Sequence, residues 1–289
     1  MNFFRTLFIC MVLLFGAFIV MKDANDWVIR PLEMIMDKVN IMAQKPTDIV
    51  ALHKEAELAH NDASYELNTI LRGILKTGEL LALVFGEAGS RILRENISML
   101  GQVKPMMPGK KIMAIFAFCD IRRFTDTTEV LQERIINFVN KVAHIVHSIA
   151  YENLGSPEKN YGDAFLLVWK IPESELIRNE LSGNIRIEEN SRVTNNLADL
   201  TVFAMAKIFA RINRDPEILN YRHNPKLQER FNGNFRLKLG FGVHLGWCIE
   251  GVLGSNIKID PSYMSVDVAI ATMLEELTKT YAKEILMSG

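Results

Sequence analysis

Apolar and amphipathic segments alternate along the second half of the chain. Short apolar runs bounded by turn residues predict buried strands, and apolar positions that recur every three to four residues predict helices. The predicted strands are 112–118, 165–169, 237–245 and 285–287. The predicted helices are 131–150, 197–212 and 266–281. Strands interleaved with helices favour an α/β or α+β sandwich, in which helices pack on a sheet.

Other segments lack a clear strand or helix period. Residues 172–193 and 214–234 are polar and charged, so we expect loops or insertions there. Residues 48–97 show helical periodicity interrupted by glycines, as in a signalling linker or a dimerisation helix. A stiff turn over Pro105–Lys111 precedes the first predicted strand, and we place the start of a C-terminal domain, 105–289, at this turn.

The N-terminus is strongly apolar. No charged residue interrupts Leu7–Met21, and residues 2–21 approach the ~20 residues that cross a bilayer. We therefore predict a single-pass membrane anchor at 1–21, with the C-terminal domain in the cytoplasm. The alternative is a secretory signal peptide, but Met21 is followed by Lys22 and Asp23 rather than by a small-residue cleavage site.

An amphipathic pattern follows the apolar segment directly. Apolar residues recur at three to four positions over 26–43, with Pro31 near the start, which predicts a helix. Its position and the sequence from Arg30 to Glu33 resemble the first helix of a HAMP signal-relay module. A juxtamembrane helix that packs on its surroundings is the alternative. In either case we expect 22–104 to be a helical linker.

Charge and cysteine content exclude several classes of protein. Lysine plus arginine number 33 against 34 aspartate plus glutamate, so no basic surface for nucleic acid is indicated. The cysteines Cys10, Cys119 and Cys248 are far apart and form no C-x-x-C pair. We therefore expect neither a disulfide framework nor a zinc site, as in a reducing cytosolic setting.

Two short motifs each place one carboxylate at the end of a predicted strand. In Phe118–Thr125 (FCDIRRFT), Asp120 follows an apolar run, and in Lys159–Val168 (KNYGDAFLLV), Asp163 precedes one. If the two strands are neighbours, the aspartates can bind divalent cations, since hard ions such as Mg²⁺ take oxygen ligands and often a substrate phosphate. The pair then indicates a two-metal phosphoryl-transfer site.

These motifs, followed by the glycine series Gly240–Ser255, resemble class III nucleotidyl cyclases in order and character. The resemblance runs from about Ile112 to the C-terminus, and in character it is similar to the protist type of catalytic domain. It implies a ferredoxin-like α+β domain that dimerises head to tail, as a homodimer or a heterodimer, with active sites at the interface. The glycine series does not fit a dinucleotide-binding fingerprint, because it lies within a predicted strand and no suitable helix follows.

The resemblance also implies roles for individual residues. Two aspartates of one protomer, here Asp120 and Asp163 with Ile121 beside them, would hold two Mg²⁺ or Mn²⁺ ions. Phe124 and Thr125 would bind the substrate, ATP. The metals would lower the pKa of the ribose 3′-hydroxyl while it attacks the α-phosphorus, so that cyclic AMP and pyrophosphate form.

Lys159 stands where adenylyl cyclases of this family carry an adenine-binding lysine and guanylyl cyclases tend to carry glutamate. A lysine offers only donors, which suit an adenine ring nitrogen, whereas guanine also presents donors that need an acceptor. The alternative is a solvated lysine in a loop. Ser262 falls where related enzymes carry a second purine-contacting aspartate or threonine, and its hydroxyl could bond the base.

The chain departs from the family pattern in two ways. The helix after the glycine series usually carries an asparagine that orients the ribose and, four residues later, an arginine that stabilises charge at phosphorus. This chain has Ala269 and Met273 at these positions. It also stops at Ser288-Gly289, about where the family continues to its last strands, so we expect a truncated sequence or a decayed domain.

The leading hypothesis is a membrane-tethered adenylyl-cyclase-like subunit that binds ATP with Mg²⁺ or Mn²⁺ through Asp120 and Asp163. Turnover would then need a partner protomer that supplies the missing asparagine and arginine. The alternative is a catalytically inactive module that dimerises and regulates or scaffolds a partner. The retained aspartates favour the first hypothesis, whereas Ala269, Met273 and the short C-terminus favour the second.

Overall fold

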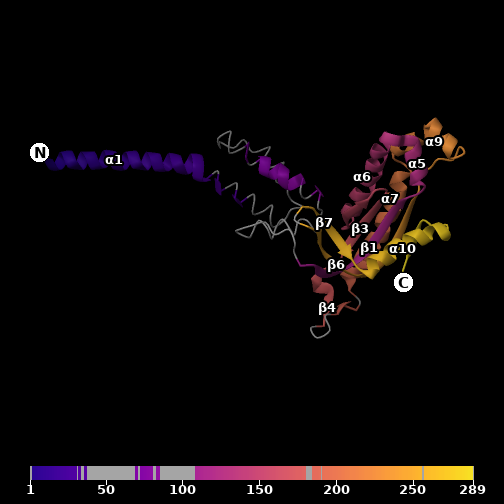
Figure 1. Ribbon diagram of the computed structural model, residues 1–289. Coiled ribbons are helices and arrows are strands. Elements are labelled where there is room, and N and C mark those ends of the chain that lie inside the picture. Colours follow the sequence, from indigo (N-terminus) through magenta and orange to yellow (C-terminus); the bar gives the residue numbers. More distant parts are fainter. Residues whose placement is uncertain are drawn as a thin grey trace. The chain divides into compact units, whose positions relative to one another are not determined.

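The structure, a computed structural model, divides the chain into two compact units, Met1–Lys104 and Pro105–Gly289 (Figure 1). It describes residues 2–30, 32–33, 36–37, 69–70, 72–80, 83–84, 108–179, 184–189, 191–255 and 257–288. Both aspartate motifs lie in the second unit.

An apolar helix begins the N-terminal unit. Helix α1 spans Asn2–Ala24 and continues into a π-helical turn, η1, at Asn25–Ile29. The helical stretch Phe3–Ile29 is long and apolar enough to cross a membrane, and its most apolar window is fully exposed. A signal sequence near an N-terminus meets the same criteria of length and hydropathy, so the anchor and the signal peptide stay as alternatives.

The predicted linker lies largely outside the described residues. Over 26–43 and 48–97, the parts that the structure describes are helical, including 72–80. The resemblance to a HAMP module falls mostly on the other residues and stays a prediction.

A six-stranded sheet forms the centre of the C-terminal unit, with the order β2-β3-β1-β6-β7 and with β8 paired to β6. The β6–β8 pair is parallel and the other pairs are antiparallel. The strands are β1 (Lys110–Ile121), β2 (Ser156–Tyr161), β3 (Ala164–Lys170), β6 (Leu239–Gly254), β7 (Ile259–Met264) and β8 (Ile285–Met287). The four predicted strands are confirmed as β1, β3, β6 and β8.

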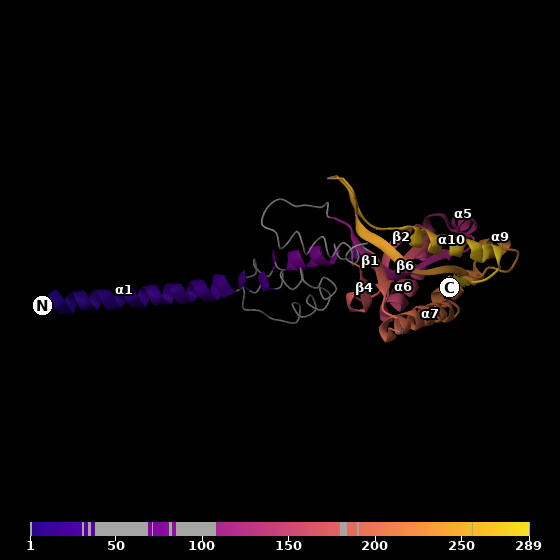
Figure 2. The ribbon, with the colours of Figure 1, turned by 90° about the horizontal axis from the view of Figure 1, so that it is seen from below.

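Helices cover both faces of this sheet. Helices α6 (Ile135–Glu152) and α7 (Arg192–Ile212) pack on one face and α10 (Val266–Thr280) packs on the other, as Figure 2 shows. Alternate residues of β1, such as Ala117 and Cys119, are buried in the core beneath α6 and α7. Because side chains alternate across a strand, β1 turns Asp120 to the face that α10 covers.

Side-chain caps determine where α7 and α10 begin. Ser191 Oγ accepts a hydrogen bond from the Thr194 amide at 3.0 Å, and Ser265 Oγ accepts one from the Val268 amide at 3.0 Å. Each cap satisfies a main-chain donor that has no partner within the first helical turn. The predicted starts at 197 and 266 were late by five residues for α7 and correct for α10.

Glycines in β6 let α10 lie directly on the sheet. A side chain at Gly242 would overlap main-chain atoms of Ala271 and Glu275 in α10, and one at Gly246 would overlap Asp267. A side chain at Gly240 would overlap the guanidinium of Arg122. The glycine series therefore serves close packing between helix and strand, as a series inside a strand can do.

The two segments expected to be loops or insertions contain short elements, so the prediction of loops was wrong. Residues 172–193 include a 3₁₀ turn η4 and a two-stranded hairpin, and 214–234 include two short helices with a 3₁₀ turn between them. These elements are η4 (Glu173–Glu175), β4 (Leu176–Arg178), β5 (Ile185–Ile187), α8 (Pro216–Asn220), η5 (Tyr221–His223) and α9 (Pro225–Arg230). Elements this short hold less than two helical or strand periods, so periodicity could not reveal them.

Local capping could have indicated the two short helices. Asp215 and Asn224 each accept hydrogen bonds from two main-chain amides of the helix that follows, and each is followed by proline. An Asx residue before a proline is a recognised helix start. The sequence analysis also missed the polar edge strands β2 and β7. It missed helix α5 (Phe124–Leu131) as well, which begins within the first motif and leads into η3 (Gln132–Arg134).

Candidate functional site

Asp120 and Asp163 meet at one end of two neighbouring strands. Strand β1 pairs with β3 so that Asp120 lies opposite Ala164, the residue after Asp163. The Ile121 amide donates a hydrogen bond to the Asp163 carbonyl at 3.2 Å. Gly162, with φ of 72°, makes the tight turn from β2 to β3 and so places Asp163 at this edge. The condition for a shared site, that the two strands are neighbours, is therefore met.

The two carboxylates lie within electrostatic reach of each other. Partial burial raises the pKa of the Asp163 carboxyl, and the charge of Asp120 raises that pKa further. Two carboxylates that repel each other in a partly dry site suit a divalent cation, which would relieve the repulsion. Among the described residues no three His, Cys, Asp or Glu side chains gather as a metal site. The aspartates therefore fit a metal only with added oxygen ligands, such as main-chain or phosphate oxygens.

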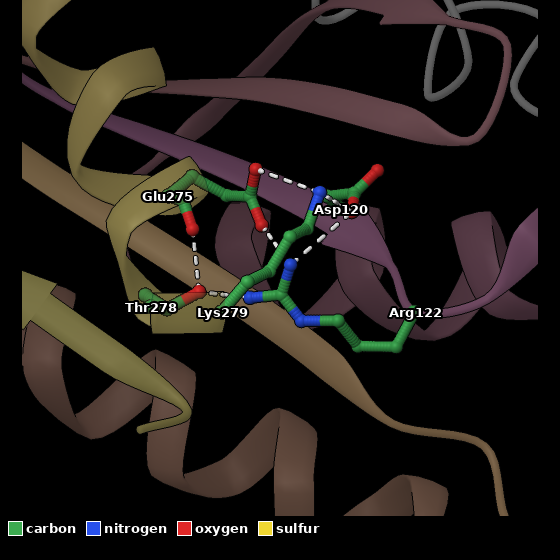
Figure 3. Close-up of polar contacts among 5 residues, drawn as sticks. All are labelled: Asp120, Arg122, Glu275, Thr278 and Lys279. Carbon is green, nitrogen blue, oxygen red and sulfur yellow. Dashed lines mark hydrogen bonds and ion pairs between the residues drawn. The ribbon is translucent and has the colours of Figure 1, made fainter. Parts of the chain in front are cut away.

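Cationic side chains already surround Asp120 (Figure 3). Arg122 Nη1 lies 3.4 Å from Asp120 Oδ2, and Lys279 Nζ lies 3.3 Å from the same oxygen. Arg122 follows directly after β1, whereas Lys279 comes from the last turn of α10. The site therefore holds positive charge beside the carboxylate that the sequence assigns to a metal.

Glu275 and Thr278 of α10 bind Arg122 from the other side. Arg122 forms an ion pair with Glu275 Oε1 and donates a hydrogen bond to Thr278 Oγ1, which in turn donates to the Glu275 carbonyl. Burial raises the pKa of the Glu275 carboxyl, the charge of Asp120 raises it further, and Arg122 opposes both effects. Arg122 thus links the end of β1 to α10.

Phe124 and Thr125 begin helix α5 directly after this site. Arg123 precedes them in the left-handed region, with φ of 54°, which turns the chain sharply from strand to helix. Phe124 is partly buried against the core and Thr125 is exposed. Both residues follow Asp120 within five positions of the chain, and no hydrogen bond joins the Thr125 side chain to Asp120 or Asp163 in the part of the chain that the structure describes.

Lys159 forms an ion pair rather than lying free in a loop. It lies in strand β2, and its Nζ is 2.6 Å from Asp260 Oδ2 in strand β7. These are the two edge strands of the main path through the sheet, so this contact joins opposite edges. Ser262, two residues after Asp260, donates to the Asp260 carbonyl at 3.5 Å. The carboxylate beside Lys159 is thus Asp260, which the sequence reading missed.

Ala269 and Met273 lie one helical turn apart on the exposed side of α10. The Met273 side chain is 51% exposed, and Ala269 is exposed as well. Neither side chain offers a charge or a hydrogen-bond donor. The opposite side of α10 carries Glu275 and Thr278 at buried positions, where polar residues on the apolar face of a helix indicate a buried partner. That signal could have led from the sequence to the Arg122 network.

Comparisons with known proteins find two kinds of similarity. A family model described as the RasGEFs all helical domain matches residues 1–98, which is well under half of the chain. The chain is 24% identical over 172 residues to an adenylate cyclase of Anabaena cylindrica. It is also 24% identical over 179 residues to the terminal-differentiation-specific adenylate cyclase of Dictyostelium discoideum.

The structure is similar to that of a bacterial light-regulated adenylyl cyclase. The TM-score is 0.54 at 17% sequence identity, over 77% of this chain and 55% of that one. The C-terminal unit has the class III cyclase fold. This confirms the predicted α+β class.

The curated relatives of this cyclase fold are much longer proteins. The alignments cover 59% and 62% of this chain but only 28% and 7% of the two adenylate cyclases. The shared part is therefore the size of a single domain within those proteins.

Proposed function

We propose that this chain is a membrane-tethered, adenylyl-cyclase-like protein of cyclic nucleotide signalling. In this proposal residues 1–21 anchor the chain, 22–104 form a helical linker, and 105–289 form a cytoplasmic cyclase homology domain. The observation that carries it is the meeting of Asp120 and Asp163 at the ends of β1 and β3 within a class III cyclase fold.

The two aspartates and Ile121 would bind Mg²⁺ or Mn²⁺ together with ATP. Once bound, the metals would neutralise the triphosphate and activate the ribose 3′-hydroxyl. Phe124 and Thr125, at the start of α5, would flank the phosphates. Arg122 keeps one oxygen of Asp120 oriented while the rest of that carboxylate stays available to a ligand.

A partner protomer would complete the site. Because the resemblance places active sites at a head-to-tail interface, Asp120 and Asp163 of one chain would face Ala269 and Met273 of a second copy. Neither residue can orient a ribose or stabilise charge at phosphorus. A heterodimer with a cyclase domain that carries the asparagine and arginine is therefore the arrangement in which this chain supports turnover.

Metal-dependent nucleotide binding tests this proposal. We expect the full chain in detergent to bind α,β-methylene-ATP at least about tenfold more tightly with Mn²⁺ than without, because bare carboxylates repel a triphosphate. Asp163→Asn should remove most of that difference. Asp199→Asn, which removes an equal charge from an exposed position on α7, should leave it unchanged. Binding of equal strength with and without Mn²⁺ would contradict the assignment of the two aspartates.

Base choice gives a second prediction. If Lys159 and Asp260 read adenine, Lys159→Glu should weaken binding of the ATP analogue and favour the GTP analogue, since the change puts an acceptor at the base edge. The measurement is the ratio of the two dissociation constants with Mn²⁺ present. As a control, Lys159→Glu combined with Asp260→Lys restores the ion pair in reverse. If that double variant recovers the original preference for ATP, the pair is structural and does not read the base.

An inactive regulatory module is the second candidate function. The observation that favours it is the loss of both transition-state residues at Ala269 and Met273, on a helix that otherwise packs as part of the domain. Such a module would bind a cyclase partner without raising cyclic AMP production through its own aspartates. The effect of Asp163→Asn on a mixed dimer distinguishes the two functions.

A further inference from the structure

Two cationic side chains that differ in exposure lie beside one oxygen of Asp120. Arg122 approaches Asp120 Oδ2 to 3.4 Å and its side chain is only 16% exposed, whereas Lys279 approaches the same oxygen to 3.3 Å and is 54% exposed. Arg122 is also held by Glu275 and Thr278. Beyond Asp120, Lys279 lies 3.9 Å from Glu275 Oε2, and its charge also acts on the Asp163 carboxylate. Lys279 is thus the cation that can leave Asp120 without disturbing the core.

The position of Lys279 in α10 keeps the free-energy cost of moving its ammonium away from Asp120 small. It stands in the last turn of the helix, where a positive charge is favoured whichever way the side chain points. Glu275 lies one turn earlier, so the ammonium can stay near a carboxylate after it leaves Asp120. Figure 3 shows Lys279 reaching over Arg122 toward Asp120 from α10.

A divalent cation bound to the Asp120 carboxylate and the Lys279 ammonium on Oδ2 would repel each other. Mg²⁺ binds carboxylate oxygens at about 2.1 Å, so an ammonium on the same oxygen would lie within a few ångströms of the metal and repel it. A metal on either oxygen of Asp120 would repel both cations, but Arg122 is held by Glu275 and Thr278, so Lys279 is the cation that metal binding would displace.

We propose that Lys279 is a tethered counter-ion that competes with the divalent cation for Asp120 and so sets the metal affinity of the site. This inference rests on the proposed function, because it takes Asp120 and Asp163 as the metal-binding pair. Without metal, Lys279 and Arg122 neutralise Asp120 and keep the site assembled. With metal, Lys279 is released, and its ammonium becomes available to an anionic ligand such as a nucleotide phosphate.

The test measures metal binding in the absence of nucleotide. The full chain in detergent is titrated with Mn²⁺ alone, and free Mn²⁺ is read from its EPR signal. We expect Lys279→Met to bind Mn²⁺ about five- to tenfold more tightly than the unmodified chain, because a competing charge is removed from a half-exposed contact. Lys279→Arg keeps the charge and should bind as weakly as the unmodified chain.

A matched control distinguishes the effect of the direct Lys279–Asp120 contact from the effect of the overall positive charge near the site. Lys283→Met removes the same charge from an exposed lysine in the turn after α10, and we expect it to change Mn²⁺ affinity less than twofold, since exposed charges at longer range are screened. Thermal unfolding of each variant shows whether it is folded. An equal gain in Lys283→Met, or no gain in Lys279→Met, would overturn the inference.

A third variant distinguishes two negative outcomes: that Lys279 does not compete with the metal, and that Asp120 and Asp163 do not bind a metal at all. Asp163→Asn should weaken Mn²⁺ binding in the unmodified chain and in Lys279→Met alike. If Mn²⁺ binding depends on Asp163 but not on Lys279, the metal site stands and the counter-ion role is wrong. If no Mn²⁺ binding depends on Asp163, the metal site itself is wrong, and the inference is overturned with it.

Discussion

We expect the isolated chain to form no measurable cyclic AMP and a mixed dimer to form it readily. Loss of a single preorganised transition-state donor lowers rates by about 10² to 10³, and here a donor and a cation are both absent at Ala269 and Met273. In a self-dimer both composite sites would contain these residues. In a mixed dimer, one site would combine Asp120 and Asp163 of this chain with an intact asparagine and arginine.

The assay uses a partner cyclase domain whose own metal aspartates have been replaced, so that it is inactive alone. Cyclic AMP production with Mn²⁺ is then measured for each component and for the mixture. The control is Asp163→Asn in this chain, which should return the mixture to background. A second route is the double variant Ala269→Asn with Met273→Arg, which should give the isolated chain a gain of at least about 10².

Two results would contradict this reading. Robust activity of the unmodified chain alone would show that Ala269 and Met273 do not occupy the positions assigned to them. Activity of the mixture that survives Asp163→Asn would favour the regulatory module, because this chain would then act without its own metal pair.

The second large effect is expected at Gly242, where α10 lies directly on β6. The added side chain of Gly242→Ala would overlap the Ala271 carbonyl and the Glu275 amide, and neither main-chain atom can rotate out of the way. Overpacking of this kind costs about 1–3 kcal/mol, and a shift of α10 would also pull Glu275 away from Arg122. We expect a clear loss of stability of the C-terminal unit.

The measurement is the urea midpoint for unfolding of the C-terminal unit, followed by near-ultraviolet circular dichroism. Gly251→Ala on the same strand is the matched control. The Cβ atom added there would have the Gly109 Cα as its nearest neighbour, at 3.2 Å, and would lie away from α10. Its midpoint should change much less. Equal midpoints for the two variants would show that α10 does not depend on close contact at Gly242.

Long apolar patterns predicted the principal elements correctly, because burial on one or both faces imposes a period that many residues share. Strand β3 is buried along almost its whole length, and the run at 165–169 located it. The motif around Asp163 placed the turn at Gly162, where a left-handed residue is needed. Short polar elements such as α8, α9 and the β4–β5 hairpin carry no such period and were missed.

The sequence by itself determined the mixture of strands and helices, the central strands and the two aspartates at strand ends, because these depend on local periodicity and on motifs of a few residues. The resemblance to class III cyclases added the choice of α+β. Only the tertiary structure decided which charges meet. Arg122 pairs with Glu275 across 153 positions, and Lys159 pairs with Asp260 across 101. Such pairs follow from the sheet order and from the seat of α10 on the glycines of β6. Spacing along the chain does not encode these features, since every polar residue has many possible partners until the strands are placed.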